Sequence, residues 1–343
     1  MQQHHNIRPN SPSILNAHLY SEKTIKNIER KKSEIGIKKE LSTLRAIREI
    51  YHSNDSILNE IFKIRLNKTN NRCPVCNFTI STYYKKVSGK SAYRCSQCSN
   101  KIYPMVGTPL EHTHIELTTY LDAIYHLING RNGYSSWELY RKENLRRETA
   151  YNILDRIRRW IALCVNESKF IDDEIIEMDE VYMPIVDFIL EPGEKLKRGT
   201  GSQRRYPVIT MHGRTSGVTK AYPTSEVSSQ VIQEAMEWAG INKTHHIVTD
   251  ESKAYKFLDD KDNKYKHDSC NHKIKQWVNG VAHTNTLEGL HAMSKGATQR
   301  TYKGIETDNV EKYMYEVTFR FTMHDKTNLE ILEALLTILP PLF

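Results

Sequence analysis

The stretch EIIEMDEVYMP, residues 174–184, decides how this chain is expected to fold. Its apolar residues suit a buried β-strand, yet it also contains four acids, Glu174, Glu177, Asp179 and Glu180. A carboxylate in a core strand is costly unless it is paired or binds a metal. Because Asp179 shares a strand face with Val181, one interpretation is a central strand that presents an acid on one face. The alternative is an edge strand with a solvated acidic face.

Size and composition describe a polar, multidomain chain. It has 343 residues, of which 38% are hydrophobic, and its mean hydropathy is -0.61. This length suffices for two or three domains with packed cores. No apolar run approaches the roughly 20 residues that a membrane span requires. Residues 1–13 lack the pattern of a signal peptide, so we expect no membrane partner and a cytoplasmic location.

Charge is distributed unequally along the chain, whose formal net charge is +8. Residues 1–170 contain 28 Lys and Arg against 15 Asp and Glu, a net charge of +13, and residues 171–343 contain 21 against 26, a net charge of -5. The basic half suits a polyanionic partner, although a solvated basic surface would give the same count. The acidic half could suit cations or a metal.

Two Cys-x-x-Cys pairs predict a structural zinc site. The pairs are Cys73–Cys76 and Cys95–Cys98, and 18 residues separate them. This spacing is typical of zinc ribbons, in which two tight turns present four thiolates and leave no open position for catalysis. Strand-like segments between the pairs favour a zinc ribbon over residues 70–110. Two unrelated redox pairs are the alternative.

Residues 1–69 form a basic prefix with a helical pattern. Apolar residues recur at helical spacing from about residue 21 to 66, with a break near residues 53–56. The prefix could be a helical arm that touches DNA, or a helical segment that packs or dimerises.

Residues 115–165 contain three further helical patterns, of which the last is the most basic. A short link before the last helix resembles a helix-turn-helix, although a plain helical bundle is the alternative. The start of the last helix would then reach bases or phosphates through four residues: Arg146, Arg147, Thr149 and Asn152. The later basic residues, Arg156, Arg158 and Arg159, are expected to meet phosphates or solvent.

The segment 172–325 has the order of elements expected for an α/β core. A strand at 174–184 is followed by a hairpin, by a helix at 228–239 and by a short strand that ends in Asp250. Three strands, a helix and a strand ending in an acid suit an RNase H-like core. The tail, 326–343, contains an amphipathic helix that packs on the core or pairs subunits.

A third acid is expected on a helix, and HTNTLEGLHAMSK, residues 283–295, supplies Glu288. Together with Asp179 and Asp250, Glu288 could hold two Mg²⁺ ions about 3.5–4 Å apart through oxygen ligands. Lys295 lies about two helical turns after Glu288 and could contact a phosphate. Each acid taken alone could equally be a solvated carboxylate.

Taken in order, several segments resemble the zinc-ribbon DDE transposases of bacterial insertion sequences, which are relatives of the Merlin DNA transposons. The segments are YRCSQC (93–98), MDEVY (178–182), VTD (248–250), HTNTLEG (283–289) and YMYEVTFRF (313–321). The resemblance covers roughly residues 70–325, and HTNTLEG is its most specific part.

The resemblance implies a DNA transposase that cleaves element ends and transfers the strands by two-metal chemistry. It implies Asp179, Asp250 and Glu288 as catalytic acids, followed by the basic Lys295. Some family members have Asn at the third position, so Asn285 is the alternative third ligand. The implied cofactors are structural Zn²⁺ and catalytic Mg²⁺ or Mn²⁺. The implied partner is double-stranded DNA, bound by a homo-oligomer associated with the nucleoid.

Two other functions fit parts of this pattern. The chain could be a DNA-binding regulator derived from a transposase, or a structure-specific RNase H-like nuclease that hydrolyses DNA without joining ends. The complete set of Asp179, Asp250 and Glu288 favours the enzyme, because a protein that only binds DNA has no reason to keep it.

Overall fold

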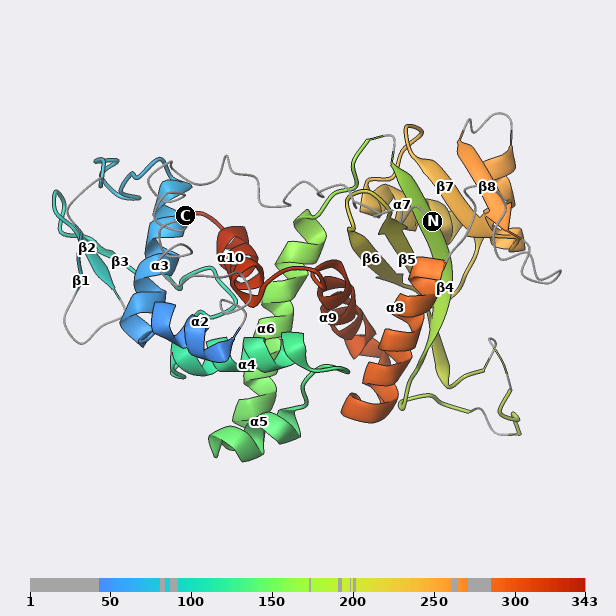
Figure 1. The fold of residues 1–343 in the computed structure, drawn as a ribbon, viewed down its shortest axis with the longest axis horizontal. Coiled ribbons are helices and arrows are strands. Elements are labelled where there is room, and N and C mark those ends of the chain that lie inside the picture. The colour runs from blue at the N-terminus through green and yellow to red at the C-terminus, as the bar shows by residue number, and fades with distance from the viewer. Residues whose placement is uncertain are drawn as a thin grey trace, which may run out of the picture. The chain divides into compact units, whose positions relative to one another are not determined.

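A computed structural model describes residues 43–80, 84–86, 92–172, 174–190, 193–197, 199, 202–260, 265–270 and 285–342 (Figure 1). The helical pattern predicted before residue 43 and the start of the HTNTLEG motif lie outside these residues. The chain divides into two compact units. The first contains the described parts of Lys169–Val181 and Pro207–Gly289, and the second contains the described parts of Ala17–Ser168, Tyr182–Tyr206 and Leu290–Phe343.

The first unit is built on a five-stranded mixed sheet with the strand order β6-β5-β4-β7-β8. The strands are β4 (Ile175–Pro184), β5 (Arg205–Gly213), β6 (Thr219–Pro223), β7 (His246–Asp250) and β8 (Lys266–Cys270). The predicted hairpin is present as the antiparallel pair β5 and β6, whereas β7 runs parallel to both β4 and β8. The acidic stretch is therefore the central strand, and the edge-strand alternative is wrong.

Alternation along β4 separates an apolar face from an acidic one. Ile176 and Met178 are fully buried in a core that also contains residues of the helix α7 (Ser229–Ala239). Since neighbouring strand residues point to opposite faces, Glu177 and Asp179 start from the other face of the sheet. The helix α7 begins at the cap Ser228, whose Oγ accepts a hydrogen bond from the backbone N–H of Val231 at 3.3 Å.

The turn between β5 and β6 is held by a buried acid at the start of β4. The carboxylate of Glu174 accepts hydrogen bonds from the backbone N–H groups of Thr215 at 2.7 Å and Ser216 at 2.5 Å. A Cβ atom on Gly213 would lie 2.6 Å from this carboxylate. Position 213 therefore requires glycine, because a side chain there would displace Glu174.

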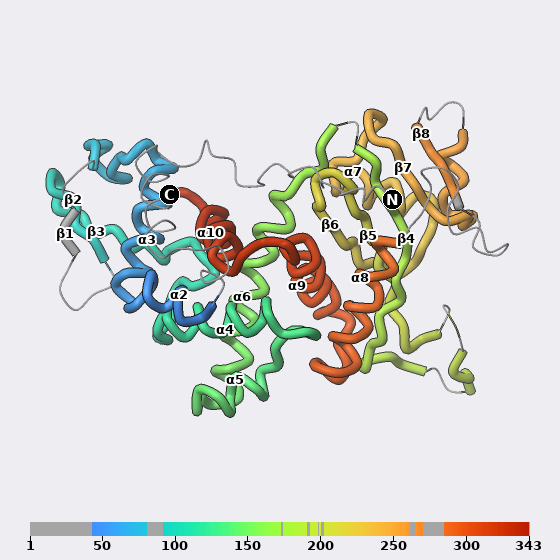
Figure 2. The backbone as a smooth tube through the Cα atoms, viewed as in Figure 1, coloured from blue at the N-terminus to red at the C-terminus, as the bar shows by residue number. Residues whose placement is uncertain are grey.

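The second unit is mainly helical (Figure 2). Its helices are α2 (Leu44–Ile50), α3 (Asn54–Asn67), α4 (Leu117–Asn129), α5 (Ser136–Glu143), α6 (Arg147–Glu167), α9 (Val310–Thr322) and α10 (Asn328–Ile338). The long helix α6 contacts α4, α5, α9 and α10. On α6, Trp160 donates a hydrogen bond through Nε1 to the carbonyl of Leu335 at 2.5 Å. The tail helix α10 therefore packs on this unit, as one of its two predicted roles requires.

A small antiparallel sheet lies beside α3. Its strands are β1 (Tyr84–Lys86), β2 (Tyr93–Cys95) and β3 (Lys101–Ile102), in the order β1-β2-β3. The ring of Phe62 on α3 stacks on Tyr93, with centroids 4.0 Å apart. Also on α3, Arg65 is 1% exposed, and burial lowers its pKa to about 10. In the described part of the prefix, α3 therefore packs against the small sheet.

The later basic residues of α6 correct a sequence prediction. The side chain of Arg158 is 3% exposed and forms an ion pair with Glu316 of α9 at 2.8 Å. The Arg156 side chain donates hydrogen bonds to the carbonyls of Pro109 and Glu111. Arg158 is therefore not available to phosphate or solvent as expected, whereas Arg156 is half-buried and engaged through one nitrogen. The remaining residue, Arg159, is 71% exposed and pairs with Asp155 at 2.6 Å.

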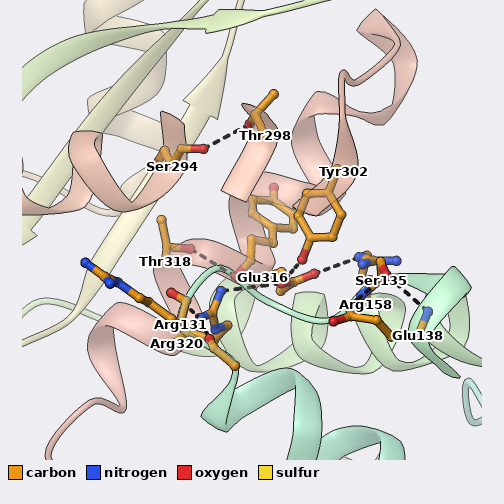
Figure 3. Close-up of polar contacts among 12 residues, drawn as sticks. Arg131, Ser135, Glu138, Arg158, Ser294, Thr298, Tyr302, Glu316, Thr318 and Arg320 are labelled. Carbon is orange, nitrogen blue, oxygen red and sulfur yellow. Dashed lines mark hydrogen bonds and ion pairs between the residues drawn. The ribbon is translucent and has the colours of Figure 1, made fainter. Parts of the chain in front are cut away.

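Figure 3 shows the buried polar network around Glu316. Besides Arg158, the Glu316 carboxylate accepts a hydrogen bond from the hydroxyl of Tyr302, which ends the π-helical turn Ala297–Tyr302. Arg320 donates to the carbonyl of Gly130. Burial alone would lower the pKa of Arg158, but the Glu316 charge raises it. The network joins α6, α9 and the link between α4 and α5.

Within the described part of the chain, no helix combines the length and the apolar character needed to cross a bilayer.

Candidate active site

Two of the predicted acids meet on neighbouring strands, Asp179 midway along β4 and Asp250 at the end of β7. In the parallel pair of β4 and β7, Glu177 lies opposite Val248. Two residues further along each strand, Asp179 and Asp250 occupy corresponding positions, which point to the same face of a parallel pair. One carboxylate oxygen from each of Asp179, Glu180 and Asp250 lies within 4.8 Å of the others. The structure therefore brings the two predicted aspartates together and adds Glu180.

The electrostatics of this acidic cluster are unfavourable without a cation. Burial raises the pKa of Asp179 to about 7, and the charges of Glu180, Asp250 and Glu288 act in the same direction. Burial also raises the pKa of Glu180, with a further contribution from Asp250. Neighbouring carboxylates with little access to water repel one another when they ionise. A bound cation would stabilise their ionised forms.

Unsatisfied oxygen atoms point to the same conclusion. Among the described residues, the buried Oε1 of Glu180 and the hydroxyl of Tyr255 both lack a hydrogen bond of normal geometry. Tyr255 is 1% exposed, and its pKa is raised by burial and by the charge of Glu180 beside it. A cluster of carboxylate oxygens with an unsatisfied acceptor fits a hard divalent cation, which takes oxygen ligands.

Glu288 lies close to this cluster but outside it. It is an exposed residue in the first turn of α8 (Asn285–Gly296), and its charge raises the pKa of Asp179. It is not among the acids whose oxygens lie within 4.8 Å of one another. The alternative ligand, Asn285, is exposed at the first position of the helix.

The predicted phosphate contact, Lys295, is exposed near the end of α8. It lies about 10 Å along the helix axis from Glu288, since seven residues at about 1.5 Å each separate them. Its neighbour His291 is buried, and this burial, together with the Lys295 charge, lowers the pKa of His291 to about 4. His291 is therefore neutral near neutral pH and leaves Lys295 as the cation on this part of the helix.

Glu180 and Tyr255 were not predicted from the sequence. Strand alternation places Glu180 on the face opposite Asp179, so adjacency alone argued against a shared site. In the structure the backbone N–H of Glu180 donates to Asp179 Oδ1 at 2.8 Å, which bends the Asp179 side chain toward its neighbour. Nothing in the sequence around Tyr255 indicated that its hydroxyl would face an acid.

The four cysteines of the predicted ribbon form a second cluster. The Sγ atoms of Cys73 and Cys98 are 3.7 Å apart, and those of Cys76 and Cys95 are 3.8 Å apart. All four lie within 4.8 Å of one another. Disulfide sulfur atoms would be only about 2.05 Å apart. Four thiolates at about 2.3 Å from a central ion would be about 3.8 Å apart at the corners of a tetrahedron, so the spacing fits a tetrahedral metal.

Two equivalent turns produce this thiol geometry. After Cys76, Asn77 has a φ of 57° and donates its N–H to the carbonyl of Cys73 at 3.0 Å. After Cys98, Ser99 has a φ of 58° and donates to the carbonyl of Cys95 at the same distance. Burial would raise the pKa of Cys95, but the backbone N–H groups of Cys98 and Gln97 help lower it to about 7.

The helices α5 and α6 present a basic and aromatic surface. Asn144, with a φ of 49°, ends α5, and α6 begins three residues later. Of the predicted DNA contacts, Arg146, Arg147 and Asn152 are exposed and Thr149 is half-buried. We call the exposed residues of this region, Trp137, Arg146, Arg147, Tyr151 and Asn152, the α5–α6 surface.

Two aromatic residues of the α5–α6 surface were missed by sequence reasoning. Trp137 is 50% exposed and Tyr151 is 41% exposed. The guanidinium of Arg147 lies 3.9 Å from the centre of the Trp137 ring. Helical periodicity does not distinguish an exposed aromatic residue from a core one, so only the three-dimensional arrangement reveals this pair. The pair combines a cation with a flat apolar surface.

Comparison with known proteins gives a consistent set of matches. Residues 172–322 match the family model of the ISXO2-like transposase domain. An uncharacterized protein in transposable element ISH50 of Halobacterium salinarum is 22% identical over 272 residues, which are 77% of this chain and 90% of that protein.

Three solved structures show distant similarity. A simian T-cell lymphotropic virus intasome in complex with PP2A regulatory subunit B56 gamma aligns with a TM-score of 0.27 and 14% identity, over 49% of this chain and 56% of that chain. A pre-cleavage Mos1 transpososome aligns with a TM-score of 0.25 and 10% identity, over 64% and 78%. The HTLV-2 integrase catalytic core domain in complex with magnesium aligns with a TM-score of 0.20 and 12% identity, over 42% and 98%.

Proposed function

We propose that this chain is a DDE transposase of an insertion sequence, which cleaves the ends of its element and joins them to target DNA; the match of residues 172–322 to the ISXO2-like transposase domain supports this. One observation carries the proposal. Asp179 and Asp250, which are 71 positions apart in the sequence, converge in a half-buried acidic cluster on the adjacent parallel strands β4 and β7. Such a cluster has little structural value, because carboxylates repel one another when buried.

The acidic residues would hold divalent ions for phosphoryl transfer. We assign Asp179, Asp250 and Glu288 as the ligands of Mg²⁺ or Mn²⁺, and Glu180 as a further acid beside them. When bound by these residues, such ions would supply Lewis-acid chemistry for the attacking water or 3′-hydroxyl and for the leaving oxygen. Lys295 would contact a phosphate of the DNA backbone. Asn285 is the alternative third ligand.

The second unit would grip the DNA. The cysteine cluster is assigned as a structural Zn²⁺ site, supported by thiol separations of 3.7 and 3.8 Å and by the absence of an open position. Double-stranded DNA would contact Arg146, Arg147, Thr149 and Asn152 at the start of α6, as in a helix-turn-helix. Transposition joins both ends of an element to target DNA. We therefore further propose that the protein acts as a homo-oligomer on DNA.

Replacement of Asp179 tests the proposal. We expect Asp179→Asn to lower Mg²⁺-dependent release of 3′-hydroxyl ends from a duplex containing the element end by a factor on the order of 10³, since an essential metal ligand is lost. Affinity for the duplex should remain within about twofold, because the basic residues of α6 are unchanged. Cleavage is followed on labelled duplexes by denaturing gel electrophoresis.

A matched control and two contrary outcomes complete this experiment. Asp268→Asn removes an exposed carboxylate of β8 that pairs with His246, outside the acidic cluster, and should leave cleavage unchanged. Full activity of Asp179→Asn would eliminate the proposed metal site. If the wild-type protein hydrolyses DNA without joining ends, the activity is that of a nuclease, and if it binds without cleaving, it is a regulator.

A further inference from the structure

Glu177 is a fully buried carboxylate that the acidic cluster does not include. It lies on β4 two residues before Asp179, and 0% of its surface is exposed. Its Oε1 accepts a hydrogen bond from Nε of Arg214 at 2.8 Å. Arg214 belongs to the turn between β5 and β6, and its backbone N–H donates to the carbonyl of Ile175 at 3.0 Å. The charge of Glu177 is therefore balanced within the sheet.

The same carboxylate also holds the start of α8. Oε1 of Glu177 accepts from the Thr286 hydroxyl at 3.0 Å, and Oε2 accepts from the Thr286 backbone N–H at 3.2 Å. Thr286 is the second residue of α8, where backbone N–H groups have no acceptor within the helix. A negative charge there also interacts favourably with the helix dipole. A residue of the central strand thus supplies an acceptor for this helix end.

The position of this contact matters for the active site. Glu177 and Asp179 share a face of β4, and Glu288 follows Thr286 by two residues on α8. A link between Glu177 and Thr286 therefore fixes the first turn of α8 against the strand that contains Asp179. Glu288 lies outside the acidic cluster. The position of α8 therefore determines the distance between the Glu288 carboxylate and those of Asp179 and Asp250.

We propose that Glu177 is a positioning residue that sets Glu288 relative to Asp179 by holding the start of α8. This inference rests on the proposed function for its catalytic consequence. Glu177 itself is not a metal ligand, because Arg214 and Thr286 already engage its oxygens. Its role is to keep the third acid within reach of the other two.

Glu177→Gln tests the proposal with little change in shape. The amide retains one oxygen acceptor but presents an NH₂ group to donors, so at least one contact with Arg214 or Thr286 is lost. We expect Mn²⁺ to bind about 10- to 100-fold more weakly to the full-length protein, as is usual when a residue supporting a ligand is changed. We also expect faster amide hydrogen exchange in the peptide that covers residues 285–290. Titration calorimetry and mass spectrometry measure these two effects.

Glu174→Gln is the matched control. Glu174 is 3% exposed on the same chain segment and holds the turn between β5 and β6 through the N–H groups of Thr215 and Ser216. Its replacement removes buried hydrogen bonds of similar kind without touching α8. It should therefore lower thermal stability while Mn²⁺ affinity and exchange at 285–290 remain at the wild-type level. Equal loss of Mn²⁺ affinity in both variants would reveal general destabilisation and overturn the proposal.

Thr286→Val examines the same link from the helix. It removes only the hydroxyl contact and keeps the backbone N–H, so we expect a smaller loss of Mn²⁺ affinity, about three- to tenfold. The double variant should bind Mn²⁺ no more weakly than Glu177→Gln alone, because both substitutions break the same contact between Glu177 and Thr286. Additive losses, or wild-type exchange at 285–290 in Glu177→Gln, would refute the positioning role.

Activity separates this inference from the function on which it rests. If wild-type protein cleaves element ends, Glu177→Gln should lower the cleavage rate and raise the Mg²⁺ concentration needed for half-maximal rate, with DNA affinity unchanged. If wild-type protein does not cleave, the proposed function fails. The Mn²⁺ and exchange measurements then still decide whether Glu177 positions α8 at a metal site.

Discussion

At the scale of single residues, chemistry and local turns determine the cysteine cluster. Each Cys-x-x-Cys pair is followed by a residue with positive φ, Asn77 or Ser99, whose N–H closes the turn. Two short turns of the same form then place four thiols at the separations of a tetrahedral site. Because each turn is local, the grouping of the four cysteines was predictable from spacing alone.

Removal of one thiol should release the metal. We expect wild-type protein to contain one Zn²⁺ per chain, and Cys73→Ser to contain none and to unfold at a lower temperature, since binding of a structural zinc contributes directly to folding. Zinc content is measured by inductively coupled plasma mass spectrometry. Cys164→Ser, which changes a cysteine near Ala334 outside the cluster, should retain the ion. Equal zinc content in the two variants would contradict the assignment.

At the scale of elements, α6 and α9 are joined by polar contacts as well as by apolar packing. Arg158 and Glu316 form the buried pair between them, and Asp155 pairs with Lys312 at 2.8 Å nearer the surface. Burial alone would raise the pKa of Asp155. The hydrogen bond and charge of Lys312, together with Arg159, outweigh burial and lower it.

This lowered pKa predicts how pH affects stability. The contribution of Asp155 is fully present above its unfolded-state pKa of about 3.9 and is lost as pH falls through the lower folded-state value. We expect Asp155→Asn to cost about 1–3 kcal/mol at pH near 7, because Asp155 is buried and loses a charge-assisted hydrogen bond with Lys312. The difference in free energy of unfolding between wild type and Asp155→Asn should shrink as the pH falls.

Urea unfolding at a series of pH values measures this difference. Asp325→Asn removes an acid whose side chain is 52% exposed and should change stability little throughout. A difference between wild type and Asp155→Asn that grows on acidification would show that the ion pair with Lys312 does not control the titration.

At the scale of the whole molecule, the net charge of +8 predicts salt-sensitive binding to DNA. If Arg146 and Arg147 each neutralise one phosphate, their joint replacement by alanine should reduce the slope of log affinity against log salt by about 2. Fluorescence anisotropy between roughly 50 and 200 mM salt measures the slope.

Arg45→Ala is the control for this measurement, because Arg45 is 90% exposed on α2 and outside the α5–α6 surface. The slope of log affinity against log salt for Arg45→Ala should equal that of wild type if the α5–α6 surface makes the phosphate contacts. An equal reduction by Arg45→Ala would instead favour a prefix that touches DNA.

The extent of sequence-based prediction also depends on scale. The strand containing Asp179, the hairpin after it and the strand ending at Asp250 followed from alternation and turn residues. The burial of Arg158 could not be predicted, because its partner Glu316 is 158 positions away and helical spacing does not reveal partners on another helix. For the same reason, neither the Tyr255 hydroxyl beside Glu180 nor the contact between Glu177 and Thr286 was predicted.

Arg65 of α3 has a consequence for biosynthesis. Its guanidinium donates at 2.7 Å to the carbonyls of Pro340 and Pro341, which lie 275 and 276 positions further along the chain. A nascent polypeptide cannot supply these acceptors until residues 340 and 341 have left the ribosome. The helix α3 must therefore await the synthesis of residues 340 and 341 before it can reach its final packing.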